Sequence, residues 1–145
     1  MSAHLYETDF YAWTQQQADL LKKKCFSEID CNNVIEELES MGRSEKRELL
    51  NRLAVLIMHL LKWQHQPLIR STSWIKTINE QRRQILLLLE DSPSLKHDIE
   101  QKILRTYNLA IKDMEKETGI QRKQLPQTCP YTFNQIMDND FWPEG

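Results

Sequence analysis

Apolar side chains recur every three to four positions along most of the chain, the spacing that places them on one face of an α-helix. The first periodic segment begins after Thr8 or Asp9, either of which can cap a helix, and continues to about Lys24. We therefore expect a first helix over this segment. The residues expected to share its inward face are Phe10, Trp13, Gln17, Leu20 and Leu21.

The second helix is expected to be the longest in the chain. Asp30 can cap its start, and the pattern continues to His65 or Gln66, because Pro67 disfavours a helical conformation in the residue before it. The residues of its apolar stripe are Val34, Leu38, Met41, Leu49, Leu53, Leu56, Leu60 and Trp63.

A break in this helix is possible at Gly42, since glycine ends helices and Ser44 could start a new one. The stripe keeps its phase across Gly42, which favours a continuous or kinked helix instead. At about 1.5 Å per residue a continuous helix would span ~50 Å, so its N-terminal part is expected to project or to meet a partner.

Two further periodic segments follow. The third helix starts within Ser71–Ser73 and ends near Glu90, and Ser92-Pro93 is expected to open the fourth, because serine caps helices and proline suits their first position. Gly119 is expected to stop the fourth helix. The expected apolar faces are Trp74, Ile78, Ile85, Leu88 and Leu89 on the third helix, and Leu95, Ile99, Ile103, Ala110 and Met114 on the fourth.

Few other features interrupt this pattern. The adjacent charges Arg82 and Arg83 are expected on a solvated face of the third helix. Near the C-terminus, Thr132 and Gln135 have the spacing of a capping box, which predicts one short helix. The chain of 145 residues has no repeat or linker. We therefore predict one all-α domain over residues 1–145: an up-and-down helical bundle of four main helices, with a long second helix and a short C-terminal extension.

Charge and hydropathy limit the partners. The formal net charge is −2, so the chain has no global field that would attract nucleic acid, although local basic patches remain compatible with it. No apolar run approaches the ~20 residues that a membrane span needs, and the first ten residues lack the apolar run of a signal peptide. We expect a cytoplasmic protein that does not enter a membrane.

Neither a metal nor a cofactor is expected. Cys25, Cys31 and Cys129 form no C-x-x-C pair, which argues against a zinc site and predicts small buried side chains. His59 and His65 are six positions apart and lie on different faces of a helix. The chain also lacks the E-x-x-H pairs of di-iron bundles and any glycine-rich phosphate loop.

A polar seam borders the apolar stripe of the second helix and consists of Glu45, Glu48, Arg52 and His59. Glu48 and Arg52 are four apart and can pair. The favoured interpretation is a structural network that fixes the helix register. Arg52 and His59 should then be largely buried, and Arg52→Ala should destabilise the fold by roughly 2–4 kcal/mol.

The alternative interpretation of this seam is catalytic. Arg52 and His59 are separated by six residues, which resembles the R-x4-6-H pattern of the HEPN helical ribonucleases. That resemblance implies that the pair would stabilise a phosphate and assist attack by a 2′-hydroxyl. In that family the motif lies near the start of a late helix, whereas here it lies deep inside an early one.

The turn between the second and third helices is a candidate anion site. Arg70, Ser71, Thr72 and Ser73 combine a cation with a helix start, whose backbone N–H groups can bind an anion. Plain capping of the third helix is the favoured interpretation.

Six ordered motifs together resemble domain-of-unknown-function family 29, small bacterial proteins found largely in photosynthetic species. The resemblance covers nearly the whole chain and implies an all-helical fold and a bacterial cytoplasmic protein. It implies no catalytic residue. The motifs are YETDFYAW at 6–13, EELESMG at 36–42, HLLKW at 59–63, SPSL at 92–95, CPY at 129–131 and FWP at 141–143.

The leading functional hypothesis is a non-enzymatic protein-interaction module. It rests on the lack of catalytic motifs, the long second helix and the aromatic C-terminal segment. The partner is an unknown protein or a second copy of the chain. The alternative is a metal-independent hydrolytic enzyme that uses Arg52 and His59.

Overall fold

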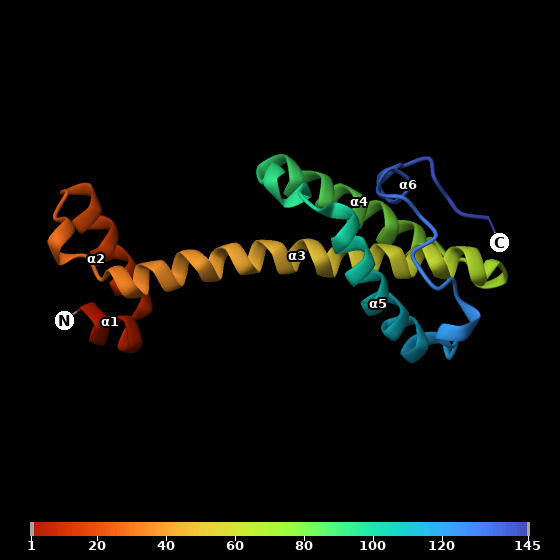
Figure 1. Cartoon of the computed structure of the whole chain (residues 1–145), viewed down its shortest axis with the longest axis horizontal. Helices are drawn as coiled ribbons and strands as arrows, with labels where there is room; N and C mark the ends of the chain where they lie inside the picture. Colours follow the sequence, from red (N-terminus) through yellow and green to blue (C-terminus); the bar gives the residue numbers. More distant parts are fainter. Residues whose placement is uncertain (1, 145) are drawn as a thin grey trace. The chain divides into compact units, whose positions relative to one another are not determined.

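The computed structural model of the protein describes residues 2–144, with side chains described for residues 4–144. Every regular element in this range is helical, and no strand occurs in it (Figure 1). The elements are α1 (Ser2–Thr8), α2 (Phe10–Lys22), η1 (Phe26–Glu28), α3 (Cys31–His65), η2 (Pro67–Ile69), α4 (Thr72–Asp91), η3 (Pro93–Lys96), α5 (Ile99–Thr118), η4 (Arg122–Gln124) and α6 (Phe133–Met137), where η denotes a 3₁₀ helix. The predicted all-α class is confirmed for the described residues, with α2 to α5 as the four main helices and α3 as the longest.

Most helix ends follow from the predicted capping residues. The carboxylate of Asp9 caps α2, and the hydroxyl of Ser71 caps α4. Gly119 closes α5 with φ 78, a left-handed conformation that glycine adopts without strain. The capping box of Thr132 and Gln135 is formed at the start of α6.

The predicted start of the fourth main helix at Ser92 and Pro93 is wrong. Pro93 opens η3, and α5 begins only at Ile99. Asp98, which immediately precedes α5, has φ 53. This left-handed conformation cannot continue a right-handed helix, so the chain turns here before α5 starts.

The chain divides into two compact units, which we name the N-terminal unit (residues 1–45) and the C-terminal unit (residues 46–145). The boundary falls inside α3, which is unbroken at Gly42, so a continuous second helix is confirmed (Figure 1). A Cβ atom added at Gly42 would meet no atom within 4 Å, so no close packing requires glycine there. The organisation of residues 1–145 as one domain stays a prediction.

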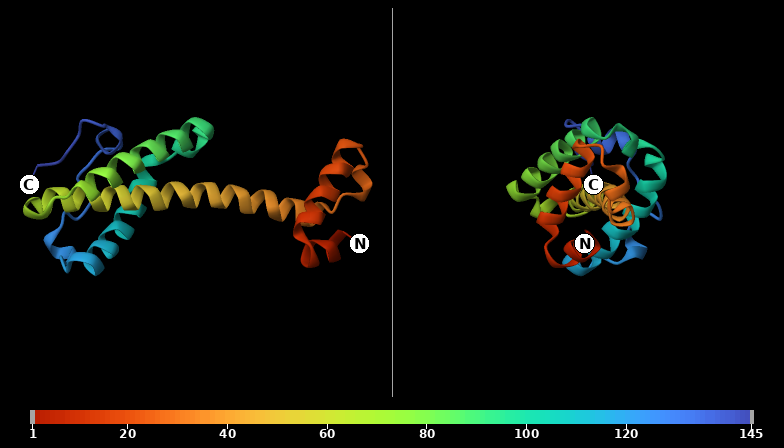
Figure 2. Two further views of the ribbon diagram at one scale, coloured as in Figure 1. Left: turned by 180° about the vertical axis from the view of Figure 1, so that it is seen from behind. Right: turned by 90° about the vertical axis from the view of Figure 1, so that its left-hand side faces the viewer.

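In the C-terminal unit, α3, α4 and α5 share one hydrophobic core. Figure 1 shows α4 turning back along α3 and α5 crossing it, and Figure 2 shows the same neighbours from behind. The burial of apolar side chains from three helices is the main stabilising contribution here. The buried residues include Leu49, Leu53, Leu56 and Leu60 of α3, Ile78, Ile85 and Leu88 of α4, Ile103, Ala110 and Met114 of α5, and Phe133 and Ile136 of α6.

Arg82 contradicts the prediction of a solvated face on α4, because it is only 2% exposed. Its guanidinium donates from Nε to the carbonyl oxygen of Ile136 (2.8 Å) and from Nη2 to those of Phe141 (2.8 Å) and Gln135 (3.4 Å). Arg82 therefore holds the C-terminal segment against α4. Its neighbour Arg83 does lie in solvent, as predicted.

The cysteines also differ from the prediction, because none is buried. Cys31 is exposed at the start of α3, Cys25 and Cys129 are half-buried, and all three are free thiols. Partial burial raises the pKa of the Cys129 thiol, which keeps it in the less reactive protonated form.

Candidate functional site

The N-terminal unit leaves most of its large apolar side chains in water. Within its described residues Trp13 is the one large apolar side chain that is buried, at 3% exposure. Exposed apolar groups gathered in one region mark interaction sites more often than chance placement does. The exposed residues are Phe10, Tyr11, Leu21, Phe26, Ile35, Leu38 and Met41.

Three of these residues form a row on α3. Ile35, Leu38 and Met41 are three positions apart, so they share one helix face, and they are 53%, 60% and 62% exposed. We name them the α3 stripe. The same periodic pattern is buried further along α3, from Leu49 onward, so the stripe has the chemistry of a packed surface although more than half of each of its side chains is exposed.

An aromatic cluster and side-chain hydrogen bonds connect the helices of the N-terminal unit. The rings of Tyr6, Phe10 and Trp13 lie 4.8–5.8 Å apart between centroids. Trp13 Nε1 donates to the Asp30 carboxylate at 3.0 Å, and the Asp30 N–H donates to the side-chain oxygen of Gln17 at 2.8 Å. The helix α1, which the apolar pattern did not predict, brings Tyr6 into this cluster.

The ionisable groups in these contacts are tuned by their hydrogen bonds. The side chain of Asn33 and, to a lesser extent, Trp13 donate to Asp30 and lower its pKa, although partial burial opposes them. Tyr6 donates to Glu37 at 2.5 Å, and this bond raises the pKa of Tyr6 to about 12. Polar contacts therefore connect α1, α2 and α3 in the N-terminal unit, whereas a hydrophobic core connects the helices of the C-terminal unit.

The N-terminal unit is also acidic. Its 45 residues hold nine Asp and Glu against four Lys and Arg, a formal net charge of −5, which leaves +3 of the total of −2 for the C-terminal unit. The exposed apolar residues thus lie in an anionic surrounding. The carboxylates Glu36, Glu37 and Glu39 lie on the same stretch of α3 as the α3 stripe.

The predicted polar seam on α3 is only partly assembled. Arg52 Nε donates to Glu48 at 2.9 Å, the predicted pair, and Arg52 Nη1 also donates to Gln81 of α4 at 3.2 Å. The Arg52 side chain is 29% exposed, so it is less buried than predicted. Glu45 belongs to the N-terminal unit and is exposed.

His59 is bonded within its own helix. Its Nδ1 lies 2.8 Å from the carbonyl oxygen of Val55, and partial burial lowers its pKa. The imidazole is therefore neutral at pH 7, with its proton on Nδ1 donated to that carbonyl. One cavity is lined by residues within 46–50 and 94–105, a second by residues within 115–123, and a third by residues within 79–86 and 137–139. Neither Arg52 nor His59 lines any of these three cavities. The structure thus offers the proposed hydrolytic pair no shared cavity among these three.

In the turn before α4, the guanidinium of Arg70 is bonded to the protein itself. Arg70 Nε donates to the carbonyl oxygen of Trp63 at 2.8 Å, and its guanidinium lies over the Trp63 ring at 4.6 Å. Ser71 accepts a hydrogen bond as the cap of α4, while Thr72 and Ser73 are exposed. Anion binding at these four residues stays a prediction.

The described residues hold neither a metal-binding cluster nor a membrane-spanning helix. Between residues 4 and 144, no group of three or more His, Cys, Asp or Glu side chains is placed to hold a metal ion. No helix in the part that the structure describes combines the length and the apolar content needed to cross a membrane.

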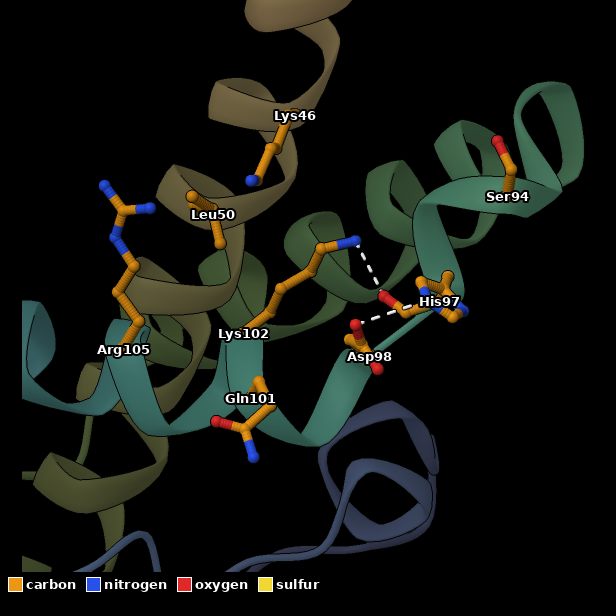
Figure 3. Close-up of a pocket in the computed structure, with 8 residues that line it drawn as sticks. All are labelled: Lys46, Leu50, Ser94, His97, Asp98, Gln101, Lys102 and Arg105. Atoms are coloured by element: carbon orange, nitrogen blue, oxygen red, sulfur yellow. Dashed lines mark hydrogen bonds and ion pairs between the residues drawn. The ribbon is translucent and has the colours of Figure 1, made fainter.

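One cavity of the C-terminal unit gathers basic side chains. It has a volume of about 350 Å³ and lies between α3, η3 and the first turns of α5. Figure 3 shows Lys46 reaching from α3, and Lys102 and Arg105 from α5, on either side of Leu50. The remaining lining residues are Ser94, His97, Asp98 and Gln101.

This cavity was not predictable from the sequence. Lys102 and Arg105 are three apart and share a face of α5, which is a usable signal, but nothing in the sequence connects them with Lys46, more than fifty positions earlier. Their proximity depends on how α5 crosses α3.

One family model matches nearly the whole chain, but its description names no activity. A family model described as a domain of unknown function, DUF29, matches residues 5–142. Comparisons with curated proteins and with solved structures gave no match.

Proposed function

We propose that this chain, which belongs to the DUF29 family, is a non-enzymatic interaction protein whose α3 stripe binds a basic, amphipathic helix of a partner protein. The observation that carries the proposal is the contrast on α3 itself. Its apolar pattern is buried from Leu49 onward, whereas Ile35, Leu38 and Met41 are more than half exposed.

The energy available from this surface supports binding. Burying a Leu, Ile or Met side chain completely contributes roughly 1.5–3 kcal/mol, and each residue of the α3 stripe has about half of that still to gain. Helix-in-groove partners use the same spacing, with apolar anchors three and four positions apart.

Charge favours a foreign, basic partner over a second copy. Two N-terminal units meeting face to face would each bring a net charge of −5, and like charges across an interface oppose association. A partner helix that is apolar on one side and rich in Lys or Arg at its edges would instead complement Glu36, Glu37 and Glu39.

The test begins with capture from cells of the native organism, using the full chain as bait. Leu38→Gln removes an apolar anchor without changing charge, and Leu104→Gln on α5, where Leu104 is 47% exposed, is the matched control. A protein captured by the wild type and by Leu104→Gln is then purified and titrated by calorimetry. We expect Leu38→Gln to weaken its binding about tenfold and higher salt to weaken it further.

Equal binding by both variants would contradict the proposal, as would a partner whose contact region is acidic. Analytical ultracentrifugation of the isolated chain supplies an independent check. A concentration-dependent dimer that Leu38→Gln dissociates would identify the occupant as a second copy and overturn the choice of a foreign partner.

A further inference from the structure

We propose that the cavity between α3, η3 and α5 binds the phosphate group of a small organic phosphate, with Lys46, Lys102 and Arg105 as its cationic contacts (Figure 3). This site lies in the C-terminal unit and does not depend on the function proposed for the α3 stripe.

Two of the three cations have no hydrogen-bond or ion-pair partner among the residues that the structure describes. Within residues 4–144, neither Lys46 nor Arg105 makes a hydrogen bond or an ion pair, a property that they share with the exposed Arg47 and Lys112. They differ from those two residues because they line one cavity together with Lys102. In Figure 3 the side chains of Lys46 and Arg105 come from different helices and lie on opposite sides of Leu50, while Gln101 points away from them. Two cations that line one cavity from different helices, without a counterion from the described residues, favour an external anion as their counterion.

The third cation is held in place before any ligand arrives. Lys102 Nζ donates to the carbonyl oxygens of Leu95 (2.5 Å) and His97 (2.9 Å), which lie in and just after η3. These bonds leave one ammonium proton for a ligand and fix the position of the charge. A cation that is already ordered loses little conformational entropy on binding, which strengthens the contact.

The charge balance of the cavity favours an anion with more than one negative charge. Asp98 is the one carboxylate among the lining residues, and its Oδ2 lies 3.2 Å from His97 Nε2. Three cations thus face a single carboxylate, which leaves a formal excess of two positive charges. A phosphate monoester carries about two negative charges at neutral pH.

The shape of the cavity indicates a ligand larger than the phosphate group alone. Its volume of about 350 Å³ lies at the lower end of the range for small-molecule sites, roughly 300–1,000 Å³. Leu50, which is 7% exposed, gives the cavity an apolar wall. A phosphate group beside the three cations would leave the organic part of the ligand against this wall.

Isothermal titration calorimetry of the full chain tests the site with adenosine 5′-monophosphate, and adenosine is the phosphate-free comparison. We expect the monophosphate to bind and adenosine not to bind at the same concentrations. Lys46→Gln and Arg105→Gln should each weaken binding roughly tenfold, the equivalent of one lost charge-assisted contact. Lys112→Gln, an equal loss of charge from an exposed position on α5, should weaken it less than about twofold.

Three results would overturn the proposal: no binding of the monophosphate at millimolar concentration, equal binding of adenosine, or equal weakening by Lys112→Gln. The last result would indicate general attraction to a basic surface. Thermal melts of the three variants should match the wild type. Among the described residues, the side chains of Lys46, Arg105 and Lys112 make no hydrogen bond or ion pair that their replacement could remove. A lower melting point in either cavity variant would instead assign that residue a structural role.

Discussion

In the C-terminal unit, apolar side chains from α3, α4, α5 and α6 fill one core, whereas in the N-terminal unit one tryptophan is buried and side-chain hydrogen bonds connect the helices. Both units contain amphipathic helices with the same apolar spacing. They differ in whether the apolar face of one helix packs against the apolar face of another. A region that stays folded through directional polar contacts can leave its apolar groups free for another molecule.

The two kinds of contact also differ in strength. Hydrogen bonds between side chains contribute about 0.5–1.5 kcal/mol each, because both groups lose contacts with water when they pair. Complete burial of one large apolar side chain contributes roughly 1.5–3 kcal/mol. The N-terminal unit should therefore open more readily, and the following experiments test that difference, from the largest expected effect to the smallest.

The largest effect is expected for Arg82→Met in the C-terminal unit. The change removes the donors to the carbonyl oxygens of Gln135, Ile136 and Phe141 while it keeps an apolar stem. We expect the free energy of unfolding to fall by roughly 3 kcal/mol, because buried acceptors lose their partners. Urea denaturation measures the change, and Arg83→Met is the matched control, expected to stay within about 0.5 kcal/mol. Equal effects of the two changes would show that the buried guanidinium contributes little.

Trp13→Phe should destabilise the N-terminal unit alone. The phenyl ring keeps part of the aromatic cluster with Tyr6 and Phe10, but the hydrogen bond to Asp30 is lost. We expect a loss of about 1–2 kcal/mol. Hydrogen exchange followed by mass spectrometry should show faster exchange before residue 46 and unchanged exchange after it. Faster exchange in both units would contradict their separate stabilisation.

Acidification should weaken the C-terminal unit first. Burial lowers the pKa of His59 in the folded state, so the neutral ring contributes stability that is complete above its ordinary pKa of about 6.5 and is lost as the pH falls through the lowered value. The pKa of Asp30 is also lowered, so its contribution is complete above about 3.9 and is lost only below that value. Hydrogen exchange between these two values, corrected for the intrinsic rate, should change in the C-terminal unit only. His59→Gln should reduce this response, and the remainder is expected from His65, because burial lowers its pKa in the same unit.

Gly42→Ala should stabilise the protein by about 0.5–1 kcal/mol. Glycine lies in the interior of α3, where it costs more conformational entropy than alanine, and a Cβ atom has open space there. A thermal melt measures the gain. A loss of stability would show that this position is packed against something, such as a second chain.

Arg52→Ala should have the smallest effect. The sequence alone predicted a loss of roughly 2–4 kcal/mol from a buried pair. The structure shows Arg52 and Glu48 with side chains 29% and 46% exposed, so water screens them and a loss below about 1 kcal/mol is expected. A loss of more than 2 kcal/mol in a thermal melt would restore the buried interpretation.

The fold was predictable wherever local chemistry determines the conformation. The caps at Asp9, Ser71 and Gly119 end or start helices through bonds within a few residues, and the apolar period shows which face is buried. The start of α5 was not predictable, because the left-handed turn at Asp98 is formed by a residue that rarely adopts it. The burial of Arg82 had a signal, since it is four positions after Ile78 and three before Ile85, but a charge on such a stripe needs acceptors that only the folded chain supplies.

The candidate sites were less predictable than the fold. The pair of Glu48 and Arg52 followed from helical spacing, whereas the contact from Arg52 to Gln81 depends on how α4 packs on α3. Leu38 and Met41 of the α3 stripe were placed on the apolar face of this helix by the sequence, whereas Ile35 was missed. The apolar pattern is the same where it is buried and where it is exposed, so the sequence could not separate Leu38 from Leu53.

The contacts of Arg82 also have a consequence for the order of events during synthesis. Its three carbonyl acceptors belong to residues 53–59 positions later in the chain. The ribosome releases the chain from the N-terminus, so α3, α4 and α5 emerge while this guanidinium still lacks its acceptors. Nascent chains that stop before residue 135 would carry a guanidinium without its carbonyl acceptors beside a core that still lacks Ile136, and both features would mark them as unfinished for cellular quality control.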